Sequence, residues 1–477
     1  MTILLILVLL ALLLVAGVPI GYSMAIAGTV GLFAEGGWTA VSGILSTSPY
    51  RVSASWVLTA LPLFLLMAEF ISSSGLAMKL YNAAYKWLSW LPGSLAISTI
   101  FSTAAFGAIS GSSTAATATM TRTAVPEMLR YGYDPRLALG VVATAGTLAM
   151  MIPPSVVLII YGILTETSIG SLFIAAIIPG ILTAVVYAAL TIIWVKMRPD
   201  IAPSRRVPSL RTADQGSQTM SPAESSISGE TFTPDDGDSQ EQETGPELGE
   251  VDQLNTEPLF SWSEKFSALG EVYPVLILFF LVMGGIYSGA VTITEAAAVG
   301  AVGALGFAVL SGNMSLRDFF AALKSTTRVT AMIFMIIIGA HILGFFFTLT
   351  RVTPTLLNFI GDLGVSPWII MVIFLCLYIF LGFFMDQLAI LVLTVPIVLP
   401  IVTGLGFDAI WFGIVIVKTI EIGLATPPLG LNVFVAGSIS NLPLSVGFRG
   451  AARYVMCDIL VLAVMVAFPA MVLWLVP

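Results

Sequence analysis

Long apolar segments separated by short polar connections run through most of the chain. None shows the strict alternation of apolar and polar positions that marks a half-buried strand. Several reach the ~20 helical residues that are needed to cross a bilayer. The pattern therefore predicts an all-α polytopic membrane protein. The apolar segments fall at about 2–17, 20–35, 56–74, 95–129, 136–166, 170–196, 273–290, 294–311, 328–350, 367–403, 410–440 and 444–475.

One polar stretch interrupts this pattern near the middle of the chain. From Pro199 to Lys265 the residues are mostly Ser, Thr, Pro, Gln, Asp and Glu, which is typical of a disordered, solvated linker. The whole chain nevertheless has 57% hydrophobic and only 10% charged residues, which excludes a water-soluble domain. We predict a first membrane repeat at 1–198, a cytoplasmic linker at 199–265 and a second membrane repeat at 266–477.

The second set of apolar segments copies the first at a shift of 274 residues. Overall identity at this shift is low, but the residues that interrupt helices coincide without gaps. Two structural repeats are the simplest explanation. The coinciding residues are Pro126 and Pro400, Gly132 and Gly406, Asp134 and Asp408, and Pro153-Pro154 and Pro427-Pro428.

Each repeat contains backbone that a bilayer does not normally allow. We expect 95–129 and 367–403 to be re-entrant hairpins, and 136–166 and 410–440 to be helices broken at their Pro-Pro pairs. Unpaired backbone groups in hydrocarbon cost several kcal/mol each unless protein or a wet cavity surrounds them. Broken helices at this depth therefore favour an ion or solute site. The alternative is that small residues and prolines only let helices pack closely.

The basic residues indicate the orientation of the repeats. Five crossings per repeat, with hairpins that return to their own side, make the second repeat inverted. If the N-terminus lies outside, Arg51 and Arg351 fall outside, Arg122 and Lys418 lie within segments, and the other fifteen Lys and Arg residues fall inside. The positive-inside rule supports this arrangement, with both termini outside and a cytoplasmic linker.

The broken segments supply the oxygen ligands that a sodium ion needs, namely free carbonyls and hydroxyls. We expect one site at the hairpin tip 110–114, predicted to be unwound, and another at the tip 385–388. Each tip is expected to meet the broken helix of its own repeat. Asn432, one turn beyond the second break, could face an ion or a substrate. The ion-binding candidates are Ser110, Gly111, Ser112, Ser113, Thr114, Gly146, Thr147, Asp386, Gly423 and Thr426, and the substrate-binding candidates are Pro153, Pro154, Pro427, Pro428 and Asn432.

Ionisable side chains inside a membrane cost about 2.5–3.5 kcal/mol each on insertion scales, so each is a functional candidate. Asp386 is the best of them because it lies at a predicted hairpin tip. Lys418 and Glu421 are three positions apart on one helical face and are predicted mainly to neutralise each other. One histidine and two cysteines without metal-ligand spacing give no support for a transition metal, a cofactor or an enzyme. No nucleic-acid partner is expected.

The chain resembles the large membrane (M, DctM-type) subunit of tripartite ATP-independent periplasmic (TRAP) transporters, within the ion transporter superfamily. The likeness covers nearly the whole chain except the long linker. The last two of the matching stretches are the most specific. In chain order, the matching stretches are Phe106–Thr114 with Ala124–Met128, Gly132–Asp134, Ile152–Ser155, Gly284–Gly289 with Thr294–Ala298, and Glu421–Asn432.

This resemblance implies an elevator-type importer in a bacterial inner membrane, driven by sodium rather than ATP. Its expected partners are a small four-helix membrane subunit, on a separate polypeptide, and a periplasmic solute-binding protein. The substrate would be an organic acid such as a C4-dicarboxylate or a sugar acid. Membrane lipid surrounds such a protein. A stand-alone ion-coupled carboxylate carrier of the same superfamily is the alternative function, and an intramembrane enzyme is a third hypothesis without a catalytic constellation to support it.

Overall fold

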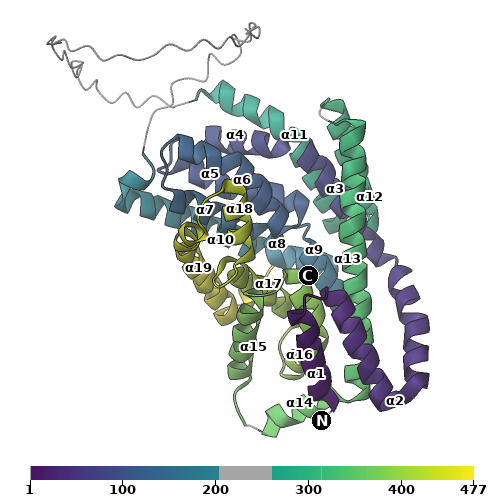
Figure 1. Cartoon of the computed structure of the whole chain (residues 1–477). Coiled ribbons are helices and arrows are strands. Elements are labelled where there is room, and N and C mark those ends of the chain that lie inside the picture. Colours follow the sequence, from purple (N-terminus) through teal and green to yellow (C-terminus); the bar gives the residue numbers. More distant parts are fainter. Residues whose placement is uncertain (1, 204–259, 313, 363, 477) are drawn as a thin grey trace, which may run out of the picture. The chain divides into compact units, whose positions relative to one another are not determined.

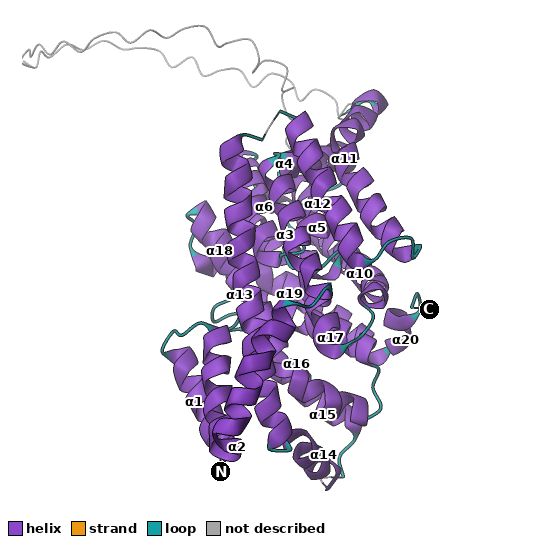
Figure 2. Cartoon of the chain, turned by 90° about the vertical axis from the view of Figure 1, so that its right-hand side faces the viewer, coloured by secondary structure: helices purple, strands orange, loops and turns teal. Residues whose placement is uncertain are grey.

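Every regular element is a helix in the part of the chain that the structure describes (Figure 2). This structure is a computed structural model, and it describes residues 2–203, 260–312, 314–362 and 364–476. The predicted all-α class is confirmed. Most of the predicted linker, residues 204–259, lies outside the described residues. The next helix, α11, begins at Trp262, a few positions before the predicted start of the second repeat.

Two groups of helices follow from the contacts between elements (Figure 1). In the first, α13 packs along α2, and α12 packs along α3. The second holds the hairpins, the broken helices, α10 and α19. The short helix α4 joins α3 to α5, and α14 joins α13 to α15. The first group comprises α1 Thr2–Val15, α2 Ile20–Ser53, α3 Ala60–Ser73, α11 Trp262–Tyr287, α12 Ile293–Leu310 and α13 Leu316–Leu349, and the connectors are α4 Leu76–Leu88 and α14 Val352–Asp362.

The second group contains the segments in which the sequence predicts hairpins and breaks. It includes the most deeply buried helices, because α7, α8, α9 and α17 have most of their side chains covered. The elements are α5 Ser94–Ser110, α6 Ser113–Arg130, α7 Pro135–Ala145, α8 Leu148–Met151, α9 Val156–Thr165, α10 Ile169–Met197, α15 Pro367–Gly382, α16 Gln387–Gly404, α17 Ala409–Ala425, α18 Leu431–Ser440, α19 Leu444–Ala467 and α20 Pro469–Leu473.

Six of the described helices are long and apolar enough to cross a membrane, namely α10, α11, α12, α13, α16 and α19. Two bent pairs pass the same test together: α2 with α3, and α7–α8 with α9. The described part of the chain therefore has the composition and helix lengths of a multi-pass membrane protein. Three helices extend well beyond their predicted apolar segments, since α11 begins at Trp262 and α13 at Leu316. Helix α2 continues past residue 35 to Ser53, with a local departure from helical geometry at Gly37.

The shift of 274 residues seen in the sequence recurs in the helix boundaries. Helices α6 and α16 are both 18 residues long and begin at Ser113 and Gln387. Helices α7 and α17 begin at Pro135 and Ala409, with an aspartate cap before each. Both Pro-Pro bonds are cis and lie between two helical pieces. The hairpins and the breaks thus have matching positions in the two halves of the chain.

Candidate ion and solute site

The tip of the first hairpin is a two-residue turn between α5 and α6. Gly111 has a left-handed backbone with φ of 57°, and Ser112 is extended. The Ser112 hydroxyl accepts a hydrogen bond from the Ala115 N–H, which caps α6. Ser110, Ser113 and Thr114 are helical, so the unwound part is narrower than the stretch 110–114 that the sequence predicts.

This tip lies against the first Pro-Pro break, as expected from the sequence. A methyl group on Gly111 would come within 3.0 Å of the Pro154 carbonyl oxygen and 3.1 Å of the Val156 N–H nitrogen. One turn earlier, Gly107 lies against Ala149, where an added methyl would meet the Ala149 Cα at 2.7 Å. The absence of side chains at the two glycines therefore lets the hairpin approach the broken helix closely.

A residue from the other half of the chain also reaches this tip. The Asn432 side-chain amide, on α18, donates hydrogen bonds to the Ser113 hydroxyl at 2.7 Å and to the Ala143 carbonyl oxygen at 3.2 Å. Asn432 is fully buried. The sequence predicts that each tip meets its own broken helix, but it does not predict this crossing. The reciprocal crossing also occurs, because α9 packs against α16 of the second hairpin.

Several buried oxygens near the first tip have no hydrogen-bond partner among the described residues. They are the Ser110 hydroxyl, the Thr117 hydroxyl and the Asn432 amide oxygen. Gly146 is immediately beside Thr117, since a methyl on Gly146 would overlap that hydroxyl. The same methyl would lie 3.2 Å from the Ser113 carbonyl oxygen. Uncompensated burial of a polar group costs free energy. These oxygens are therefore available to a ligand that needs acceptors. Thr117 was missed at the sequence level because the segment contains many similar threonines.

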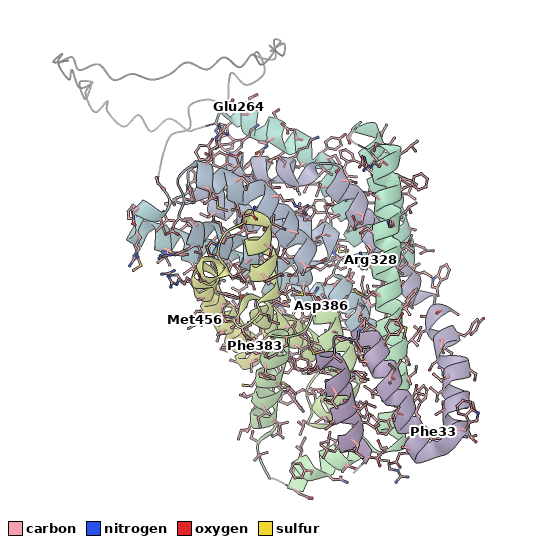
Figure 3. All side chains as sticks on the ribbon, viewed as in Figure 1. Phe33, Glu264, Arg328, Phe383, Asp386 and Met456 are labelled. Atoms are coloured by element: carbon pink, nitrogen blue, oxygen red, sulfur yellow. The ribbon has the colours of Figure 1, made fainter. Side chains whose placement is uncertain are left out.

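The second hairpin turns at residues 383–386, between α15 and α16 (Figure 3). The half-buried Asp386 caps α16, accepting a hydrogen bond from the Leu388 N–H at 3.1 Å. The next residue, Gln387, is buried, and its amide oxygen lacks a partner among the described residues. Asp386 and Gln387 occupy the same positions in this hairpin as Ser112 and Ser113 in the first.

The second hairpin approaches its own broken helix through a pair of glycines. A methyl on Gly423 of α17 would lie 2.6 Å from the Cα of Gly382 on α15. Thr426 ends α17 with an extended backbone, and its hydroxyl donates to the Ile422 carbonyl oxygen at 2.5 Å. Gly430, with φ of 49°, then starts α18. A helix C-terminus and a helix N-terminus therefore meet at this break, as they do around Pro153-Pro154.

A buried ionic network lies on the opposite face of α17. The Lys418 ammonium contacts Glu421 Oε2 at 2.9 Å and Asp458 Oδ1 at 2.6 Å, and the Tyr187 hydroxyl donates to Asp458 Oδ2 at 2.6 Å. All four side chains have zero exposure. The predicted neutralisation of Lys418 by Glu421 is confirmed. Asp458 was missed, although an aspartate within the apolar segment 444–475 is itself a signal.

The structure thus distributes the predicted site residues over two hairpin–break contacts. Asn432 joins the first contact, although it belongs to the second half of the chain. Thr147 differs from the others, since its hydroxyl donates to the Thr144 carbonyl oxygen at 2.7 Å. At the first contact the hairpin tip holds Ser110, Gly111, Ser112, Ser113 and Thr114, and the broken helix holds Gly146, Pro153 and Pro154; in the second half, Asp386 lies at the hairpin turn, and Gly423, Thr426, Pro427 and Pro428 lie on the broken helix.

Comparison with protein families gives one match over nearly the whole chain. Residues 7–471 match the family described as tripartite ATP-independent periplasmic transporter, DctM component. The C4-dicarboxylate TRAP transporter large permease protein DctM of Pseudomonas aeruginosa is 31% identical over 89% of this chain and 87% of its own length. The sialic acid TRAP transporter large permease protein SiaM of Vibrio cholerae is 26% identical, and the ectoine protein TeaC of Halomonas elongata 28%, each over 97% of this chain and 96% of its own.

A solved structure has the same fold. The YdaH transporter of Alcanivorax borkumensis superposes with a TM-score of 0.57, covering 92% of this chain and 90% of its own. Only 12% of the aligned residues are identical, so this likeness concerns the fold alone.

Proposed function

The chain belongs to the DctM component family of tripartite ATP-independent periplasmic transporters, and on that premise we propose that it imports an organic acid with a sodium gradient. Membership makes the protein a membrane transporter rather than an enzyme. We further propose that the acid is delivered by a periplasmic binding protein and that a small four-helix membrane subunit completes the system. Relatives named for C4-dicarboxylate and sialic acid support an acid as substrate.

The unpartnered oxygens at the first hairpin tip are the observation that carries the sodium proposal. Hydroxyls of Ser110 and Thr117 and the amide oxygen of Asn432 are buried acceptors without a donor in the described part of the chain. A small hard cation would satisfy such a set without requiring a proton. Ser112, Ser113, Thr114, Gly146 and Thr147 remain further candidates there. In the second half, we propose Asp386, Gly423 and Thr426, with the buried Gln387 oxygen as an addition.

The solute is proposed to bind between the two breaks. Helix α9 begins at Val156 and helix α18 at Leu431, each within a few positions after a Pro-Pro pair. A helix N-terminus carries partial positive charge and free N–H groups, which favour a carboxylate. The solute would be bordered by the prolines of the two breaks, Pro153, Pro154, Pro427 and Pro428. Asn432 would link ion binding to solute binding, because its side chain contacts the first hairpin tip.

Matching hairpins and breaks in the two halves support inverted repeats and an elevator-type movement. Secondary transporters with such repeats bind substrate near the bilayer midplane, where discontinuous helices meet. We propose that the second group of helices moves against α2, α3, α12 and α13. The inner membrane is the proposed location, with periplasmic termini and the polar stretch 199–265 in the cytoplasm, in keeping with the positive-inside rule.

Uptake by reconstituted protein tests this function. Proteoliposomes that contain the chain and its small membrane subunit are supplied with radiolabelled organic acids, with the binding protein and an inward sodium gradient each present or withheld. We expect uptake only when both are present. Uptake with sodium alone would instead identify a stand-alone carrier. Sodium-independent uptake would refute the coupling.

Replacing Thr117 with valine should weaken sodium binding without disturbing the helix. Valine keeps the shape of threonine but removes the unpartnered hydroxyl. The sodium concentration for half-maximal uptake should rise about tenfold, which corresponds to roughly 1.4 kcal/mol of lost binding free energy. The measurement is a sodium titration of uptake at fixed ionic strength.

Thr121 provides the matched control for this substitution. It is buried one turn further along α6, and its hydroxyl already donates to the Thr117 carbonyl oxygen at 2.6 Å. Thr121→Val should leave the sodium dependence within a factor of about two, since it removes only a satisfied hydroxyl. Equal shifts in the two variants would count against Thr117 as a ligand.

A further inference from the structure

The buried network of Tyr187, Asp458, Lys418 and Glu421 has no part in either proposed ion site, yet it lies on α17, the helix that contacts the second hairpin. Glu421 and Gly423 are two positions apart on α17, so they face nearly opposite directions. Gly423 faces the second hairpin through Gly382, whereas Glu421 and Lys418 face α19 and α10. The network therefore holds one face of α17 against α10 and α19, while the opposite face of α17 contacts the second hairpin.

The same network reaches the first half of the chain through Tyr187. The Tyr187 hydroxyl, which donates to Asp458, lies on α10, which packs against α8 directly after Thr147. Thr147 follows Gly146, which lies against Thr117 and Ser113 at the first hairpin tip. Helix α10 thus packs against the segment before the first break and, through Tyr187, holds the ionic network on α17.

We propose that Tyr187, Asp458, Lys418 and Glu421 are positioning residues that couple the two sodium sites. In this arrangement, ordering of the Gly146–Thr147 segment by an ion at the first site holds the Tyr187 hydroxyl on Asp458. Asp458 then holds Lys418 and Glu421, so α17 presents Gly423 and Thr426 to the second hairpin in a fixed position. Binding at one site would favour binding at the other. This proposal rests on the proposed sodium coupling.

The neighbouring tyrosine on α19 offers a control, because it is buried beside Tyr187 but has no hydrogen bond to Asp458. Tyr454 is fully buried, and its ring packs edge-on against Tyr187 with centroids 5.3 Å apart. Its hydroxyl pairs with Thr191 at 2.8 Å. Tyr187→Phe and Tyr454→Phe therefore each remove one buried phenolic oxygen from the contact between α10 and α19. Only the first of them removes a partner of the ionic network.

Equilibrium binding of radioactive sodium to purified protein tests the coupling, with choline chloride keeping the ionic strength constant. The assay needs neither substrate nor partner subunits, and binding is expressed per folded molecule. We expect the wild type to bind sodium with a Hill coefficient above 1. In Tyr187→Phe the coefficient should fall toward 1 and the half-saturating concentration should rise at least about fivefold, the lower end of typical coupling between sites. Tyr454→Phe should keep the wild-type Hill coefficient, with a half-saturating sodium concentration within about twofold of the wild type.

Each other outcome has a distinct meaning. A wild type that binds no sodium would refute the proposed function itself. A wild type that binds sodium with a Hill coefficient of 1, or equal behaviour of the two variants, would overturn the coupling alone. Asp458→Asn is a second variant, which removes the charge but retains an acceptor for Tyr187. It should lower the Hill coefficient as Tyr187→Phe does, and a coefficient unchanged in Asp458→Asn would also overturn the proposal.

Discussion

Replacing Gly423 with alanine is expected to abolish uptake and to lower the stability of the protein by about 1–3 kcal/mol, the usual cost of overpacking. The new methyl would lie 2.6 Å from the Cα of Gly382 and 3.0 Å from the Ile379 carbonyl oxygen. These atoms belong to the backbone, so no side-chain rotation relieves the overlap. The second hairpin must move away from α17, which separates Asp386 from the break.

A glycine elsewhere shows what alanine does without this contact. Gly306 lies in α12, and a methyl there would meet nothing within 4 Å. Because alanine has the higher helix propensity, Gly306→Ala should stabilise the helix by about 0.5–1 kcal/mol or leave it unchanged. Thermal unfolding in detergent and uptake in proteoliposomes are the measurements. Normal uptake by Gly423→Ala would show that the close hairpin contact is unnecessary.

The positions of the hairpins and breaks were predictable because they depend on residues that disrupt helices locally. The sequence shift of 274 aligns Pro153-Pro154 with Pro427-Pro428, and both pairs separate helical pieces in the structure. Proline removes a donor and clashes with the preceding turn wherever it occurs in a helix. Turn positions could be predicted less well. At the first tip only Gly111 and Ser112 leave the helix, since Ser112 also caps the next one.

Contacts between the two halves could not be predicted, because segments that are apolar on all sides give no indication of which face meets which helix. Asn432 and Ser113 are 319 positions apart, and their hydrogen bond depends on how α18 crosses the first hairpin. The same limit applies to Lys418. Its pairing with Glu421 follows from helical spacing, whereas its shorter contact with Asp458 depends on the packing of α17 against α19.

Replacing Lys418 with methionine should destabilise the protein by about 3–5 kcal/mol, the range measured when one partner of a buried ion pair is removed. Methionine fills a similar volume but leaves the carboxylates of Glu421 and Asp458 without a cation. Both are fully buried, so water cannot solvate them in place. The expected result is a large fall in unfolding temperature, and in the yield of folded protein, at neutral pH.

Removing all three charges separates this electrostatic cost from a loss of packing. The triple variant Lys418→Met/Glu421→Gln/Asp458→Asn has no charge left in this buried network. Most of the stability lost in Lys418→Met should therefore return, because replacing a whole buried ion network by neutral residues is often neutral or stabilising. Asparagine in place of Asp458 would still offer Tyr187 an acceptor. A single Lys418→Met variant as stable as the wild type would show that the pairs contribute little. A triple variant that regains stability yet binds sodium without cooperativity would mean that the charges are needed to couple the sites rather than to hold the fold.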